Sequence, residues 1–218
     1  MLEAVLQQLN HKFLIRKISF EGMNRIETLE YPVAALRETL LNSLIHRNWM
    51  GAPTQIRVYD DKLYVWNDGA LPEGITLSEL KSFHSSRPRN PIIAEACFKG
   101  GYIDSWGSGT IKIVDVCKAA KLPEPEMDEQ FGGFIVKLFN HNYQFSEEQL
   151  QKKGCSTRQI KAVQFVKTNG TIVNKEYQEI ANISERTALK DLEDLVAKGI
   201  FIKAGEKKTT SYRLRVGG

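Results

Sequence analysis

The chain has 218 residues, 42% of them hydrophobic and 26% charged, which is enough apolar material for two modest hydrophobic cores. No run approaches the ~18 to 20 apolar residues that span a bilayer, and residues 1–10 lack the basic and apolar regions of a secretory signal, so we expect a cytoplasmic protein without a membrane partner. The three cysteines, Cys97, Cys117 and Cys155, form no C-x-x-C pair, which argues against a cysteine zinc site and indicates buried thiols.

The net charge of +4 is unevenly distributed along the chain. Residues 150–218 hold 14 Lys and Arg against 7 Asp and Glu, whereas residues 1–149 hold 16 against 19. A basic segment behind an acidic one is typical of a module that binds phosphates, because Lys and Arg release condensed counterions when they neutralise them. An ordinary soluble surface is the other interpretation of this imbalance.

Apolar spacing predicts the elements of the first part of the chain. Residues 2–9 fit a helix, residues 13–20 alternate like a strand, and Pro32 suits the first turn of a helix over 33–46. Two β-rich runs, 55–59 and 63–66, flank a compact turn and predict a hairpin. A loop rich in Gly, Pro, Ser and Arg over 70–90, helices over 91–99 and 111–120, and a strand over 132–139 complete an α+β pattern. The expected buried stripe of the 33–46 helix is Leu36, Leu40, Leu41, Leu44 and Ile45.

The last part of the chain has a different pattern. We predict a first domain over 1–144, a polar linker over 145–155 and a second domain over 156–218. In the second domain, helices over 160–168, 175–181 and 185–198 follow one another, the last two capped by Asn174 and Ser184, and Gly199 ends the third. A short extended piece over 171–173 and strands over 200–203 and 211–215 complete the pattern of a winged helix-turn-helix.

The third helix of this domain is the expected DNA-reading element. Burial of Leu189, Leu192 and Val196 would turn the residues near its amino end toward a DNA groove, while the wing would lie along the backbone. Acidic Asp191, Glu193 and Asp194 lie on the same helix, so packing against a protein partner is the alternative. The predicted DNA-binding residues are Arg186, Thr187, Lys190, Lys203, Lys207, Lys208 and Arg213.

Polar residues of the first domain suggest a second site. Glu38, Asn42 and His46 are spaced four apart and form a stripe along one flank of the 33–46 helix, although a solvated flank would look the same. Farther along the chain, Asn67-Asp68-Gly69 ends a predicted strand, and Gly107 and Gly109 precede a predicted helix.

These stretches resemble the GHKL-type ATPases of gyrase, heat-shock chaperone and histidine-kinase proteins. They are more similar to a bacterial and archaeal branch of that family, known as RecG-related proteins or transcriptional regulators, in which an α/β sandwich precedes a winged helix. The resemblance covers about residues 30 to 140. It rests on residues 35–47 (ALRETLLNSLIHR), 63–72 (LYVWNDGALP), 89–91 (RNP) and 107–109 (GSG).

The resemblance implies roles for individual residues. Asn42 would bind the magnesium that bridges the nucleotide phosphates, Glu38 would orient the attacking water as general base, and backbone N–H groups at the two glycines would cradle phosphate oxygens. The active ATPases carry an aspartate where Asn67 stands and a second glycine where Leu71 stands, and these departures argue against hydrolysis. The implied nucleotide-binding residues are Asn42, His46, Asn67, Asp68, Gly69, Arg89, Asn90, Gly107 and Gly109.

Three functions follow as hypotheses. The favoured one is a regulator that binds double-stranded DNA and whose first domain, a degenerate nucleotide-binding domain, senses a ligand or forms a homodimer, with ATP and Mg²⁺ as the candidate cofactors. The alternatives are a magnesium-dependent ATPase coupled to DNA and a protein–protein adaptor. A helicase motor is excluded because the sequence has no G-x-x-x-x-G-K-S/T loop. Many relatives carry a further amino-terminal module, so the chain is expected to be a short version or a fragment.

Overall fold

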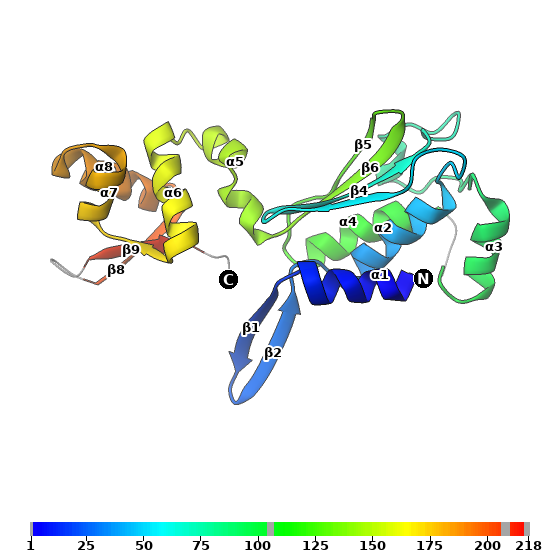
Figure 1. Ribbon diagram of the computed structural model, residues 1–218, viewed down its shortest axis with the longest axis horizontal. Helices are drawn as coiled ribbons and strands as arrows, with labels where there is room; N and C mark the ends of the chain where they lie inside the picture. Colours follow the sequence, from blue (N-terminus) through cyan, green and yellow to red (C-terminus); the bar gives the residue numbers. More distant parts are fainter. Residues whose placement is uncertain (1, 104–106, 206–209, 216–218) are drawn as a thin grey trace. The chain divides into compact units, whose positions relative to one another are not determined.

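The computed structural model describes residues 2–103, 107–205 and 210–215, apart from the side chains of residues 17, 19 and 21. The chain divides into two compact units, residues 1–141 and residues 142–218. Both combine helices with antiparallel sheets, as the predicted α+β class requires (Figure 1). Among the described residues, no helix is long and apolar enough to cross a membrane.

The amino-terminal unit begins with a helix and a hairpin. α1 (Leu2–Gln8) continues into a π-helical turn (Leu9–Phe13), and β1 (Arg16–Glu21) pairs with β2 (Asn24–Leu29). The helix and first strand are close to the predicted ranges. β2 carries no alternating apolar signal, since its residues are mostly polar and exposed, and this explains why the sequence pattern predicts only one strand here.

A four-stranded antiparallel sheet in the order β3-β4-β6-β5 forms the body of this unit. Its strands are β3 (Gln55–Val58), β4 (Lys62–Asp68), β5 (Glu126–Gln130) and β6 (Gly133–Phe139). The β3–β4 hairpin and β6 match the prediction, whereas the acidic edge strand β5 has no sequence signature. Burial alternates strictly along β4, so Leu63, Val65 and Asn67 all face the same side of the sheet.

Helices cover that side of the sheet (Figure 1). α2 (Val33–Ile45) and α4 (Gly109–Ala119) share a core with β4 and β6, and α3 (Pro91–Lys99) and a 3-10 turn (Glu79–Lys81) flank them. Pro32 precedes the first turn of α2, as expected. Four of the five residues of its predicted stripe are buried, and Leu44 is half-buried. This packing holds one face of α2 against the sheet.

The carboxyl-terminal unit has three longer helices and a small sheet. They are α6 (Thr157–Asn169), α7 (Asn174–Ala181) and α8 (Glu185–Ala197), with β7 (Thr171–Ile172), β8 (Phe201–Ala204) and β9 (Ser211–Leu214) in the order β7-β9-β8. The Ser184 hydroxyl caps α8 by accepting from the Thr187 N–H at 3.3 Å, as predicted. Asn174 lies inside α7 instead of capping it, because Val173 is the N-cap residue.

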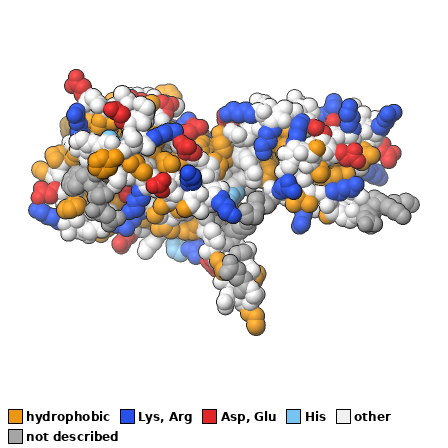
Figure 2. Space-filling model, turned by 180° about the vertical axis from the view of Figure 1, so that it is seen from behind, with side chains coloured by type: hydrophobic (Ala, Val, Ile, Leu, Met, Phe, Trp, Pro, Cys, Tyr) orange, Lys and Arg blue, Asp and Glu red, His pale blue; other side chains and the backbone are white. Residues whose placement is uncertain are grey.

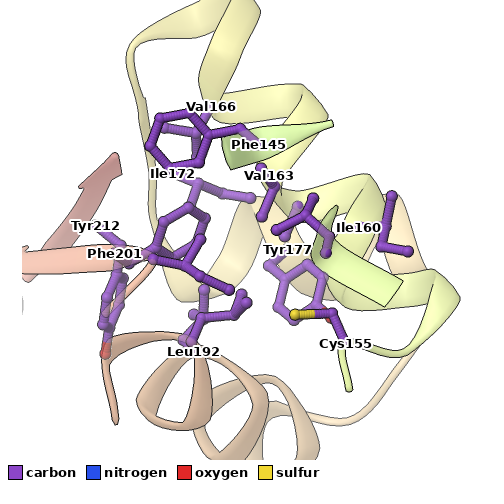
Figure 3. Close-up of a cluster of buried hydrophobic side chains, with 14 of the residues drawn as sticks. Phe145, Cys155, Ile160, Val163, Val166, Ile172, Tyr177, Leu192, Phe201 and Tyr212 are labelled. Atoms are coloured by element: carbon purple, nitrogen blue, oxygen red, sulfur yellow. The ribbon is translucent and has the colours of Figure 1, made fainter. Parts of the chain in front are cut away.

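The predicted linker over 145–155 is part of the carboxyl-terminal core. A 3-10 turn (His141–Phe145) and α5 (Glu147–Lys152) occupy this segment, and Phe145, Leu150 and Cys155 are buried with residues of α6, α7 and the sheet (Figure 3). The segment is polar on average. Its few apolar residues are nevertheless spaced so that each reaches the core, which average composition does not reveal.

The buried face of α8 differs by one position from the predicted one. Ala188, Asp191, Leu192 and Leu195 are buried, Val196 is half-buried, and Leu189 is 42% exposed. The sequence pattern identifies Asp191 only as one of three acidic residues on this helix and does not place it in the core. Here a carboxylate takes a core position because basic and hydroxyl partners satisfy it there.

Candidate functional site

A two-lobed cavity lies in the amino-terminal unit between α2, α4, the sheet and the loop over 69–87. The larger lobe has a volume of about 90 Å³ and the smaller one about 40 Å³. Both lobes are lined by Asn42, His46, Ser86, Gly107 and Gly109. The structure thus gathers residues of α2, the sheet, the loop and the start of α4 around one cavity.

One face of α2 forms a wall of the cavity. Thr39, Asn42, Ser43 and His46 line the larger lobe and follow the helical spacing of three and four residues. Glu38 is buried, with 9% exposure, and lines the smaller lobe beside Asn42. All three residues of the predicted stripe, Glu38, Asn42 and His46, therefore line the cavity. Thr39 and Ser43 are additional wall residues that the sequence pattern does not distinguish from ordinary core positions.

β4 brings Asn67, but not Asp68, to the cavity. Asn67 is buried with 4% exposure and lines the larger lobe, since it shares the helix-facing side of the strand with Val65. Asp68 points to the opposite side, where its Oδ2 accepts from Asn48 Nδ2 at 3.1 Å. Asp68 is therefore a structural residue here, and its predicted role in nucleotide binding is not supported by its position.

The two predicted glycines pack tightly against the cavity wall. A Cβ at position 109 would overlap the Glu38 carboxylate and lie 3.2 Å from Asn42 Nδ2. Gly107 has a φ of +80°, and a Cβ there would overlap the His84 carbonyl oxygen. Gly109 begins α4, whose first N–H groups have no partner within the helix. Because residue 109 has no Cβ, Glu38 and Asn42 pack directly against the amino end of α4.

The loop over 69–90 places its predicted residues unequally. Gly69 lines the larger lobe, and Arg89 lies next to it, with Nη2 donating to the Ala70 carbonyl at 3.0 Å. Asn90 instead donates from Nδ2 to the carbonyls of Ile45 and Arg47 at 2.9 and 2.8 Å. Its side-chain amide thus secures the end of α2, and it does not line either lobe.

The environment of His46 keeps its imidazole neutral. Burial, together with the electrostatic influence of nearby Arg89 and His84, lowers the pKa of His46 to about 4. The loop also supplies His84 and Arg87 to the larger lobe, neither of which the sequence analysis assigned to the site. A neutral imidazole in this wall acts as a hydrogen-bonding group and adds no charge to the cavity.

Magnesium, which the resemblance implies, would need oxygen ligands at this site. Among the described residues, no group of three or more His, Cys, Asp or Glu is placed to hold a metal ion by itself. Mg²⁺ is usually held by one or two protein oxygens together with substrate phosphates. Asn42 beside Glu38 fits that mode, in which the ion arrives with the nucleotide.

The other chemical candidates are inert. All three cysteines are free thiols, and burial raises the pKa of Cys117 to about 11, so the thiolate nucleophile is disfavoured. Burial also raises the pKa of the other two thiols.

The carboxyl-terminal unit exposes basic side chains at the start of α8. Arg186 and Lys190 are exposed one helical turn apart, together with Leu189. Thr187 is half-buried, and its hydroxyl is hydrogen-bonded to that of Ser184 at 2.9 Å, so it belongs to the helix cap. On the face of the molecule drawn in Figure 2, basic and acidic side chains are interspersed.

The basic residues of the predicted wing lie on two faces. Arg213 is paired across the sheet with Ile202 and Thr171, whereas Lys203 is paired with Tyr212. Directly paired residues of antiparallel strands share a face, and adjacent positions alternate, so Lys203 and Arg213 point to opposite sides. Both are exposed, but they do not form one patch. Lys207 and Lys208 lie outside the described residues.

Acidic residues of α8 are largely neutralised by neighbours. Asp191 accepts from Arg158 Nη2 and from the Tyr177 hydroxyl, each at 3.0 Å, and thereby joins α6, α7 and α8. Asp194 accepts from Lys198 and from Gln159, and both interactions lower its pKa. Glu193 is exposed. Of the three acids expected to oppose phosphate binding, two are held in intramolecular pairs.

Comparison with known proteins identifies an ATPase-like domain in the amino-terminal unit. Residues 51–138 match the family model described as "Putative ATP-dependent DNA helicase recG C-terminal". The match includes Asn67, Gly107 and Gly109, while Glu38 and Asn42 precede it.

One solved structure with a similar fold is that of the DIP2311 protein from Corynebacterium diphtheriae, with a TM-score of 0.56 and 21% sequence identity over 98% of this chain. The chain spans 45% of the length of that structure. A search of curated proteins found no match.

Proposed function

We propose that the protein is a DNA-binding regulator whose amino-terminal unit binds a nucleotide together with Mg²⁺ and whose carboxyl-terminal unit is a winged helix-turn-helix. The observation that carries the nucleotide proposal is the convergence of Glu38, Asn42 and Gly109 at the amino end of α4, inside a cavity of an ATPase-like domain. Such a helix end favours anions because its first N–H groups have no partners within the helix and its dipole is positive.

Each part of the cavity has a distinct task in this proposal. The amino end of α4 would receive phosphate oxygens, and Asn42 would supply a protein oxygen to Mg²⁺, which neutralises phosphate charge when bound. The apolar wall formed by Val65, Ile113 and Val136 suits a planar base. Arg87 and Arg89 in the loop add positive charge near the same cavity.

The dimensions of the cavity support a sensing role. Lobes of about 90 and 40 Å³ are smaller than the ~300 to 1,000 Å³ typical of pockets for nucleotide-sized ligands. In this proposal a complete nucleotide displaces the loop over 69–87, which also borders an open groove of about 430 Å³ lined by His46, Leu71 and Arg87. Ligand binding would then change the conformation of that loop, and a regulator can use such a change as its signal.

Calorimetric titration with ATP and ADP, with and without Mg²⁺, tests the nucleotide proposal. We expect Asn42→Ala to weaken ATP binding in Mg²⁺ by at least about 10-fold and to remove the magnesium dependence, because one protein ligand to the ion is lost. Asn169→Ala, which changes an exposed residue of α6, is the matched control. If the unaltered protein binds no ATP either with or without Mg²⁺, the proposal is overturned.

Hydrolysis is a second candidate function, favoured by the position of Glu38 in the smaller lobe beside Asn42 and Gly109. A carboxylate there could accept a proton from a water that attacks the terminal phosphate. Phosphate release measured for the unaltered protein and for Glu38→Gln tests this activity. A rate that is the same in both proteins would remove Glu38 as a general base and leave nucleotide binding as the function.

The DNA-binding proposal is supported by charge and architecture. The carboxyl-terminal segment is basic, its three longer helices are followed by the β8–β9 hairpin, and Arg186 and Lys190 are exposed at the amino end of α8. In winged-helix and helix-turn-helix proteins that end of the helix meets the major groove. Pairing of Asp191 and Asp194 within the unit reduces their repulsion of phosphates.

Fluorescence anisotropy with duplex DNA at two salt concentrations tests this proposal. Each phosphate contact contributes a slope of about −0.9 in log K against log salt, so Arg186→Ala with Lys190→Ala should reduce the slope by about two and weaken binding. Lys161→Ala removes one positive charge from an exposed position of α6 and serves as control. Binding that does not depend on salt, or an equal loss with the control, would contradict the proposal.

A further inference from the structure

The face of the four-stranded sheet that points away from α2 and α4 carries aromatic side chains (Figure 1). Tyr64 and Trp66 alternate along β4 with the buried Leu63 and Val65, so both lie on that face. Directly paired residues of the neighbouring strands share the same face. A groove of about 200 Å³ lies there, lined by Gln55, Arg57, Tyr64, Trp66, Phe131 and Ile135.

The Trp66 ring is fixed across the neighbouring strand β6. Its Nε1 donates to the Gln130 carbonyl at 2.9 Å, and a Cβ at position 133 would lie 2.5 Å from two of its ring carbons. Glycine at 133 therefore leaves the space that the ring occupies. A fixed, half-buried aromatic ring can stack with a planar ligand at little cost in side-chain freedom.

Phe131 has a backbone conformation that is unfavourable for its residue type. With Gly132 it forms the two-residue turn between β5 and β6, and the φ values are +55° and +73°. Glycine and asparagine adopt such values readily, whereas a bulky side chain does not. The side chain is 92% exposed, so its packing contributes little to the fold. Backbone strain is concentrated at functional sites, and Phe131 lines the groove together with Trp66.

Basic side chains accompany the aromatic ones on this face. The Nζ atoms of Lys62 and Lys137 lie 5.7 and 5.8 Å from the centre of the Tyr64 ring. Arg57 is exposed and lines the groove. Its Nη2 donates to Gln55 Oε1 at 3.0 Å, and because that acceptor is neutral, the contact does not offset the charge of the guanidinium.

The two lysines of this face have acidic neighbours. Lys137 pairs with Glu126 of the edge strand β5 at 3.2 Å, and Lys62 lies 3.8 Å from Asp61. Positive charge is therefore concentrated at Arg57, on the side of the groove formed by β3. An anionic chain that also carries planar groups would match this arrangement, with its charges toward β3 and its planar groups on the aromatic rings.

We propose that this face binds single-stranded DNA, with bases stacked on Trp66 and Phe131 and a phosphate held by Arg57. Aromatic platforms bordered by positive charge bind single strands, because every base has a π face and every linkage carries a phosphate. Duplex DNA, the partner proposed for the carboxyl-terminal unit, keeps its base faces within the stack. The site is separate from the nucleotide cavity, and only the choice of DNA over RNA rests on the proposed function.

Fluorescence anisotropy with a labelled short oligothymidylate, at two salt concentrations, tests the site. Phe131→Asn should weaken binding by about five-fold or more because a stacked base is lost, whereas Phe131→Tyr should retain it within about two-fold. Arg57→Gln should weaken binding and reduce the slope of log K against log salt by about 0.7. Phe20→Ala and Lys118→Gln change exposed residues elsewhere in the unit and should have no effect.

Further measurements separate this site from folding and from the winged helix. Phe131→Asn should unfold at the same temperature as the unaltered protein or about 2 °C higher, because asparagine tolerates a positive φ. It should also leave the affinity for duplex DNA unchanged. Conversely, Arg186→Ala with Lys190→Ala should leave the affinity for oligothymidylate unchanged.

Three results would overturn the inference. The first is absence of oligothymidylate binding, or binding that Phe131→Asn does not weaken. The second is tighter binding of oligouridylate, which would assign the face to RNA. The third is a dimer that Phe131→Asn converts to a monomer in sedimentation, which would assign the face to a second copy of the chain. Duplex DNA binding is measured separately, so its absence counts against the proposed function alone.

Discussion

The two units bury polar groups in different ways. In the carboxyl-terminal unit, Asp191 is buried among three helices and receives hydrogen bonds from Arg158 and Tyr177. In the amino-terminal unit, the hydroxyls of Thr39 and Thr110 are buried beside a cavity without partners. The comparison separates two kinds of buried polar residue. A buried group with all its partners supports the fold, whereas an unpaired one lowers its stability.

The largest expected effect concerns the packing of α8. Leu192→Ala should destabilise the carboxyl-terminal unit by about 3 to 4 kcal/mol, because Leu192 is fully buried and its loss leaves a cavity. Leu189→Ala should cost less than about 0.5 kcal/mol, because Leu189 is on the exposed side. Urea unfolding followed by circular dichroism measures both. Similar costs for the two leucines would show that the observed helix face is wrong.

A glycine of the cavity gives the next largest effect. Gly107→Ala should destabilise the amino-terminal unit by about 3 kcal/mol, since it combines a positive φ with overlap of the His84 carbonyl. Gly132→Ala is the control, with a φ of +73° and no atom within 4 Å of the added Cβ, and should cost about 1 kcal/mol. Equal unfolding free energies for the two variants would mean that Gly107 is not in close contact with the loop.

Removing the buried carboxylate of Asp191, which is hydrogen-bonded to Arg158 and Tyr177, should destabilise the unit more than removing an exposed carboxylate of the same helix. Asp191→Ala should lower the free energy of unfolding of the carboxyl-terminal unit by about 2 kcal/mol, because Tyr177 is left with an unpaired buried hydroxyl and Arg158 loses its carboxylate. Glu193→Ala, at an exposed neighbouring position, should change it by less than about 0.5 kcal/mol. A small effect of Asp191→Ala would remove the contrast between the two units.

A pH dependence of similar size is expected, confined to the amino-terminal unit. The pKa of His46 is about 4 in the folded protein and about 6.5 when unfolded, so the unfolded chain binds the proton more readily. The stabilisation is complete above pH 6.5 and is lost as the pH falls toward 4, amounting to about 2 kcal/mol between pH 7 and pH 5. His46→Asn should flatten this dependence, and His11→Asn, at an exposed position, should not. An unchanged pH profile in His46→Asn would contradict the buried neutral state.

The secondary structure was largely predictable where apolar residues repeat with a clear period. The helices over 33–45 and 91–99 and the β3–β4 hairpin lie close to their expected ranges. Strands β2 and β5 were not predictable, because their residues are polar and their pairing depends on contacts distant in sequence. The prediction of a linker over 145–155 was wrong for a related reason. Three apolar side chains suffice to anchor this polar segment in the core.

The cavity was predictable in part. The spacing of Glu38, Asn42 and His46 indicates a common helix flank, and all three residues line the cavity. Thr39, Thr110 and His84 could not be recognised, because small or isolated polar residues carry no periodic signal. Asp68 and Asn90 were assigned to the site by their place in a motif. Strand alternation directs Asp68 away, and hydrogen bonds to the end of α2 occupy the Asn90 amide.

Amide hydrogen exchange with and without Mg-ATP tests the central claim most directly, because it reports both units in one experiment. If a nucleotide occupies the cavity, peptides that cover residues 33–46 and 107–119 should exchange more slowly with Mg-ATP, and peptides from residues 157–197 should not change. Unchanged exchange at residues 33–46 and 107–119 at saturating Mg-ATP would contradict nucleotide binding at this site.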